Sequence, residues 1–198
     1  TYDFARWQKK YGTLQRSIDL NKECLALIDS FQYKDVLLKK KALYNLAVGY
    51  KKQNDFLGAA KYFNDIAEIE EIDNLTFKAY RLRADNVSFS GDYYRAAELY
   101  DIAIDFSKEH KKHEVFLDCS VNAALNYRKI NSQESLDKGI TLLEEAIVYL
   151  DGLDDDTKRS SISLTTVISL YLELGILHSD RPDHHFIEGK KQYEKALE

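Results

Sequence analysis

The sequence contains few of the residues that interrupt helices. Its 198 residues include one proline, Pro182, and eight glycines. Proline removes a backbone hydrogen-bond donor, and glycine loses more backbone freedom on folding than other residues do, so both weaken helices. Their scarcity predicts a chain that is almost entirely helical.

Cysteines and long apolar runs are also scarce. The two cysteines, Cys24 and Cys119, lie far apart within helical pattern. They suit buried thiols of a reducing compartment better than a disulfide framework. No apolar run approaches the roughly 18 residues that a membrane span needs. We therefore expect a cytoplasmic protein with two free thiols and no membrane partner.

The charge balance argues against one class of partner. The net charge is −5 at pH 7, which does not favour nucleic-acid binding by these residues. Hydrophobic residues make up 44% and charged residues 31% of the chain, an ordinary balance for a soluble protein.

Motifs of common enzymes are missing as well. The sequence has no Gly-rich phosphate loop and no G-x-S-x-G, H-E-x-x-H or C-x-x-C. His110 and His113 lie three residues apart without a convincing third metal ligand. One further segment is rich in metal-ligand types and leaves an enzyme or metalloprotein as a third hypothesis: His178, Asp180, Asp183, His184 and His185. The sequence otherwise predicts that the protein is not an enzyme, with no catalytic residue, metal site or cofactor.

One phrase occurs twice, 37 residues apart. Residues 54–69 read NDFLGAAKYFNDIAEI, and residues 91–106 read GDYYRAAELYDIAIDF. Small and large residues recur there at steps of four and then three, which places them on one helix face. The four sets are Ala59, Phe63 and Ile66; Ala96, Tyr100 and Ala103; Gly139, Leu143 and Ala146; and Gly189, Tyr193 and Ala196. Another helical pattern precedes each set, and polar clusters predict turns at residues 53–55, 90–92, 131–133 and 178–180.

A helix, a short turn and a second helix, repeated at 34 residues or more, indicate stacked helical hairpins. We predict an all-α fold, a superhelical array of antiparallel helix hairpins over residues 1–198. Residues 1–40 form an N-terminal helical or capping part, and residues 41–198 form about four hairpin repeats. The aromatic stripe of Tyr2, Phe4, Trp7 and Tyr11 is predicted to pack into the core or a capping surface.

These small and aromatic residues resemble those of the tetratricopeptide repeat (TPR) family. The match is good over residues 43–70 and 80–108, fair over 120–150 and poor over 165–198. Arg83 stands where the family usually has an apolar residue. The resemblance implies a TPR-like α-solenoid that serves as a scaffold and binds a peptide or partner segment on its concave surface, which the first helix of each hairpin lines.

The resemblance also implies the residues of that surface. Carried over by spacing, the predicted peptide-binding residues are Lys41, Tyr44, Asn45, Lys52, Lys78, Arg81, Asn122 and Lys129. The cations make this surface basic although the chain is acidic, and an asparagine can both donate to and accept from a peptide backbone. The pattern suits a peptide with an acidic side chain or a free C-terminal carboxylate. The alternative is that the lysines only keep the protein soluble. The family's carboxylate clamp is incomplete, because Tyr44 and Val48 occupy places where it uses Lys and Asn.

The elongated hairpins also resemble the peptide-sensing regulators of Gram-positive bacteria, which include Rap-type response-regulator phosphatases and PlcR-type transcription regulators. This resemblance implies an alternative function in signalling. The array would be a regulatory domain that changes curvature on binding a peptide and controls a DNA-binding or phosphatase segment. We expect the sequence to be a fragment of a longer chain, and homo-oligomer formation is left open.

Overall fold

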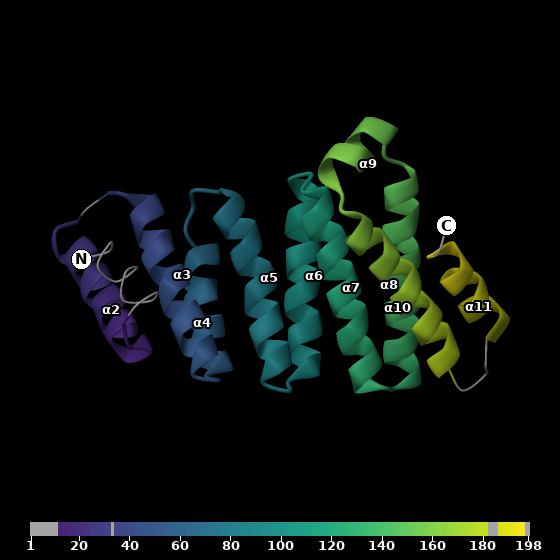
Figure 1. Cartoon of the computed structure of the whole chain (residues 1–198), viewed down its shortest axis with the longest axis horizontal. Coiled ribbons are helices and arrows are strands. Elements are labelled where there is room, and N and C mark those ends of the chain that lie inside the picture. The colour runs from purple at the N-terminus through teal and green to yellow at the C-terminus, as the bar shows by residue number, and fades with distance from the viewer. Residues whose placement is uncertain (1–11, 33, 182–185, 197–198) are drawn as a thin grey trace. The chain divides into compact units, whose positions relative to one another are not determined.

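The computed structural model describes residues 12–32, 34–181 and 186–196. These residues form ten helices, α2 to α11, and no strand (Figure 1). The all-α fold predicted from the sequence is confirmed. The chain divides into two compact units, Thr1–Gly91 and Asp92–Glu198.

The described residues of the first unit form four helices that follow one another in antiparallel order. They are α2 (Leu14–Ser30), α3 (Val36–Lys52), α4 (Phe56–Ala67) and α5 (Asn74–Phe89). Each helix packs against the next. Each begins after a polar residue whose side chain accepts a backbone N–H of the first turn: Thr13, Asp35, Asp55 and Asp73. Such caps satisfy backbone donors that have no partner within the helix, which fixes where each helix begins.

Six helices lie within the part of the second unit that the structure describes. They are α6 (Tyr93–Glu109), α7 (His113–Ile130), α8 (Gln133–Asp151), α9 (Asp155–Ser161), α10 (Leu164–Asp180) and α11 (Phe186–Lys195). Helix α7 packs between α6 and α8, and α10 packs against α7, α8 and α11. Helix α9 is a single short insertion with no buried residue, and in Figure 1 it projects beyond the ends of α8 and α10.

The small and large residues of the first three sets are buried, as the sequence predicts, whereas Tyr193 and Ala196 of the fourth set are half-buried. Ala59 and Ala96 are fully buried, and Phe63 and Tyr100 are almost so. The small residues permit close helix contacts. A Cβ atom on Gly189 of α11 would lie 3.0 Å from the Gly175 carbonyl oxygen of α10 and 2.8 Å from Ser179 Oγ. No side chain fits there without a shift of the backbone.

The predicted turns agree with the structure at three of four places. Helices meet at residues 53–55, 90–92 and around 131–132. The turn predicted at residues 178–180 is wrong, because α10 continues to Asp180. His178 is buried there, and Ser179 Oγ donates to the Gly175 carbonyl within the helix. The helix ends where Arg181, the residue before Pro182, takes an extended conformation, as a following proline favours.

The two cysteines lie on helices α2 and α7. Cys24 and Cys119 are buried free thiols, as predicted. The aromatic stripe of Tyr2, Phe4, Trp7 and Tyr11 lies outside the described residues. Within the described ranges no single helix is long and apolar enough to cross a membrane; α9 and α10 reach that length and composition only as a pair bent by 99°.

Candidate functional site

The first unit contains a groove between α3 and the start of α5. Its volume is about 480 Å³. Four of the eight predicted site residues line it: Lys41, Tyr44, Asn45 and Lys78. The remaining lining residues are Leu37, Asp73, Asn74 and Leu75. The structure therefore brings half of the predicted site residues together in one hollow, whose lining contains two cations, two amides, one carboxylate and apolar side chains.

The two lysines of the groove differ in their surroundings. Lys78 is exposed, and its Nζ atom lies 5.1 Å from the centre of the Tyr44 ring. The other contact of Tyr44 is an edge-to-face packing against Phe63 of the core, with ring centres 5.7 Å apart. Lys41 is exposed and forms no ion pair with any described residue. Both ammonium groups therefore remain accessible to an anionic group that enters the groove.

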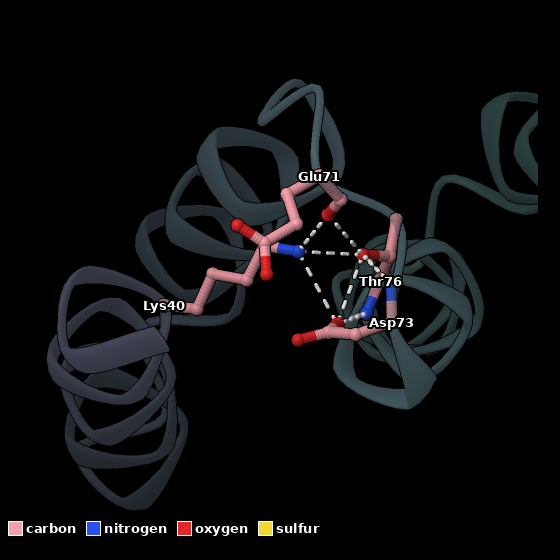
Figure 2. A network of polar contacts seen from close by, with 4 residues as sticks. All are labelled: Lys40, Glu71, Asp73 and Thr76. Atoms are coloured by element: carbon pink, nitrogen blue, oxygen red, sulfur yellow. Dashed lines mark hydrogen bonds and ion pairs between the residues drawn. The ribbon is translucent and has the colours of Figure 1, made fainter. Parts of the chain in front are cut away.

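A buried lysine joins the two walls of the groove. Lys40 of α3 has no exposed surface. Its Nζ atom donates to three oxygens at the start of α5: the Glu71 carbonyl, Thr76 Oγ1 at 2.8 Å and Asp73 Oδ1 at 3.2 Å. Figure 2 shows the ammonium group surrounded by these three oxygens. A buried charge needs partners of this kind, because an uncompensated one is very costly.

Asp73 has two roles in this network. Its carboxylate caps α5 by accepting the Thr76 N–H at 2.9 Å, and Thr76 Oγ1 accepts the Asp73 N–H in return, which forms a capping box. Burial raises the pKa of the Asp73 carboxyl, but hydrogen bonds from Thr76 and Lys40 outweigh burial and bring it below the ordinary value of 3.8. Asp73 is thus ionised and paired with Lys40, and neither Lys41 nor Lys78 forms an ion pair with a described residue.

The other predicted residues of the first unit lie outside this groove. Arg81, one turn after Lys78 on α5, lies 3.8 Å from Asp85 of the same helix and is half-buried. Lys52 is exposed in the last turn of α3. Neither residue lines the groove.

The last two predicted residues belong to the second unit. Asn122 of α7 is half-buried, and its Nδ2 atom donates to the Asp118 carbonyl one turn earlier, at 2.9 Å. Lys129, near the end of α7, places its Nζ atom 4.9 Å from the centre of the Tyr93 ring. A local contact therefore occupies one donor of Asn122, and Lys129 covers an aromatic ring.

The second unit has a hollow of opposite charge, which the sequence did not indicate. Two adjoining pockets of about 290 and 400 Å³ share Asp101, Tyr127, Glu134 and Lys138. The Tyr127 hydroxyl donates to Asp101 at 3.0 Å, and Lys138 pairs with Glu134 at 2.8 Å. Burial and the neighbouring Asp101 carboxylate raise the pKa of Tyr127. Burial also raises the pKa of Asp101. The polar groups of this hollow are largely paired with one another.

A second buried ion pair lies at the contact between α7 and α10. Arg128 Nε donates to Glu173 Oε1 at 2.7 Å, and Glu173 is 5% exposed. Burial raises the pKa of the Glu173 carboxyl, although Arg128 opposes that shift. The pair joins neighbouring helices of the second unit, as Lys40 joins α3 to α5 in the first.

The two histidine-containing segments were the other candidates for metal binding. His110 Nδ1 contacts the Phe106 carbonyl at 2.9 Å, and His113 Nδ1 contacts the Tyr149 hydroxyl at 2.6 Å. Asp183, His184 and His185 lie outside the described residues. Among the residues that the structure does describe, no group of three or more His, Cys, Asp or Glu could hold a metal ion.

Solved structures of two helical-repeat proteins are similar to this chain over almost its whole length. The TPR-like repeats of a putative kinesin light chain from Podosopora anserina are 14% identical, with a TM-score of 0.67 over 99% of this chain and 91% of that one. MamA is 16% identical, with a TM-score of 0.65 over 98% of this chain and 92% of that one. No protein-family model and no curated protein matches the sequence. At these identities the likeness shows the fold, which is that of stacked TPR-like hairpins.

Proposed function

We propose that this chain, a helical-repeat protein with the TPR-like fold, is a protein-interaction scaffold that binds a peptide segment in the groove between α3 and α5. The observation that carries the proposal is the pair of exposed lysines, Lys41 and Lys78, on opposite walls of one groove. Two cations that face one hollow favour a carboxylate between them, because charge-assisted hydrogen bonds are stronger than neutral ones.

The rest of the groove supports a peptide as the occupant. Leu37 is 47% exposed and lines the groove with Leu75, so an apolar side chain of the bound segment would lose contact with water there. Asn45 lies on the same face of α3 as Lys41, one turn further along. It lines the groove, and an asparagine amide can both donate to and accept from a peptide backbone. The bound segment is therefore an acidic peptide or a free C-terminus next to an apolar side chain.

The basic character of the groove depends on Lys40. That buried ammonium group is paired with the Asp73 carboxylate, which lines the same groove as Lys41 and Lys78, so it balances the negative charge of the lining. The Lys40–Asp73 pair supports the proposal in a second way, since it connects α3 to the start of α5 and so fixes the separation of the walls. We propose a cytoplasmic location on the basis of the two free thiols, and we assign no catalytic step to the groove.

A peptide-display selection tests this proposal. The library is selected against the whole chain and, in parallel, against the double variant Lys41→Ala/Lys78→Ala. Both lysines are exposed, so the variant should unfold at the same temperature as the wild type. Acidic or C-terminal carboxylate sequences should be enriched on the wild type and not on the variant. Equal enrichment on both proteins, or no enrichment on the wild type, would contradict the proposal.

The alternative of a peptide-sensing regulatory domain requires a bound peptide in the same way. It adds an effector segment, and no observation on the described residues favours that addition.

A further inference from the structure

An exposed aromatic side chain lies at the other end of the contact between α3 and α5. Phe89 is the last residue of α5 and is 56% exposed. Its ring centre lies 5.6 Å from that of Phe56 at the start of α4. The Nζ atom of Lys51 lies 4.5 Å from the centre of the Phe89 ring. The ring is therefore held on one side by groups of α3 and α4 while much of its surface is open to water.

Phe89 lies on the same face of α5 as Lys78, which lines the groove. Lys78 and Phe89 are separated by 11 residues, which is close to three full turns of an α-helix, so their side chains leave α5 in nearly the same direction. The helix rises 1.5 Å per residue, so about 17 Å separates the two positions along the axis. Helix α3 has the matching arrangement, because Lys40 contacts the start of α5 and Lys51, 11 residues later, contacts its end.

We propose that one bound segment spans this face of the first unit, with its carboxylate at Lys41 and Lys78 and an apolar side chain on Phe89. An extended peptide advances about 3.3 Å per residue. The distance of about 17 Å therefore corresponds to a separation of about five residues between the acidic and the apolar position. This inference rests on the proposed function, and it adds the identity and the spacing of a second recognised side chain.

The side chain that the bound segment places on Phe89 is apolar because the Phe89 ring is an exposed apolar surface. An exposed phenylalanine is a surface from which water is released when an aliphatic or aromatic side chain covers it. Lys51 and Phe56 hold the ring in place before binding, so little further ordering is required. Between the two positions, Arg81 is paired with Asp85, so this part of the face offers the segment a nearly neutral surface.

A set of synthetic peptides tests the inference. Each fluorescent peptide carries one glutamate in a background of serine and glycine, and a single leucine is placed two to seven residues from it on either side. Binding to the whole chain is measured by fluorescence anisotropy. On the wild type, leucine about five residues from glutamate should tighten binding by about tenfold relative to leucine two residues away.

Two variants test the role of Phe89 separately from the proposed binding of a carboxylate. Phe89→Ser should abolish the preference for leucine position and leave the dependence on glutamate intact. Phe31→Ser, which changes a phenylalanine that is 78% exposed at the end of α2, should leave both unchanged. If glutamate is required but the position of leucine has no effect, or if the effect survives in Phe89→Ser, the inference is wrong and the proposed function stands. If glutamate makes no difference on the wild type, both are wrong.

Discussion

Lys40 Nζ lies 3.2 Å from Asp73 Oδ1, and the lysine is completely buried while the aspartate side chain is 30% exposed. Lys40 belongs to α3, and Asp73 is the residue that caps α5. One ion pair thus joins the two helices that form the groove. Asp73 lines the groove and Lys40 does not, so a residue that no peptide would touch determines the shape and the charge of the surface that a peptide would meet.

The first prediction compares two neighbouring lysines. Lys40→Met keeps much of the aliphatic side chain and removes the ammonium group, so three oxygens at and just before the start of α5 each lose one hydrogen bond and Asp73 loses its counter-charge. We expect the free energy of unfolding to fall by about 2–3 kcal/mol, as measured by urea denaturation. Lys41→Met, one residue further and exposed, should change it by less than about 0.5 kcal/mol. Equal effects of the two substitutions would show that the Lys40 network does not stabilise the fold.

The second prediction concerns the stability of the fold at low pH. Because the pKa of Asp73 is lowered in the folded state, the ionised carboxylate stabilises the fold above the ordinary value of 3.8, and this contribution is lost as the pH falls below it. Asp73→Asn should therefore be less stable than the wild type at pH 6, with a difference that shrinks between pH 4 and pH 2. Unfolding curves at a series of pH values measure this difference. A difference that is independent of pH would rule out the hydrogen-bonded carboxylate as its source.

Glu173 should show the opposite sign. Burial raises the pKa of its carboxyl, so the folded state holds this proton more tightly than the unfolded state does. The stability of the wild type relative to Glu173→Gln should therefore fall as the pH rises above the ordinary value of 4.5. Arg128 lies 2.7 Å away and limits the effect. A relative stability that rises with pH would mean that the attraction to Arg128 outweighs burial.

The fourth prediction tests the close contact of α10 and α11. Gly189→Ala would place a methyl group 3.0 Å from the Gly175 carbonyl oxygen, and we expect it to destabilise the protein by about 1–3 kcal/mol. Gly152→Ala is the matched control. Gly152 has helical backbone angles, and its nearest atoms to an added Cβ lie at 3.5 Å. Thermal unfolding should show a lower midpoint for the first variant only; a similar midpoint for both would mean that the helices separate at little cost.

The fold could be predicted from the sequence because the spacing of its core residues repeats. Ala59 and Ala96 occur at equivalent places, 37 residues apart, and both are fully buried. Helix α9 was not predicted, because its seven residues include no buried one and so carry no apolar period. The error at residues 178–180 has a related cause. Polar residue types suggested a turn, but His178 is buried by neighbouring helices that a local pattern does not reveal.

Part of the lining of the groove could be predicted from the sequence for a similar reason, and its role as a binding site stays a prediction. Spacing identified Lys41 and Lys78, because groove residues of successive hairpins occupy equivalent helix positions. It missed Lys40, whose partners lie 31 to 36 residues further along the chain. A signal was present, since Lys40 lies on the same helix face as the buried Leu43 and Ala47. A lysine on an apolar face needs a buried counter-charge. The sequence alone did not show that Asp73 supplies it.

Lys41 and Lys78 together are proposed to hold a peptide carboxylate. The most direct measurement is an isothermal titration of the best glutamate-containing peptide into the wild type and into Lys41→Ala/Lys78→Ala, at low and at high salt. A charge-assisted hydrogen bond contributes about 1.5–3 kcal/mol, so the variant should bind at least about tenfold more weakly. Added salt should weaken binding to the wild type more than binding to the variant, because salt screens the attraction of exposed charges. Equal affinity and equal salt dependence in a variant that remains folded would contradict the claim.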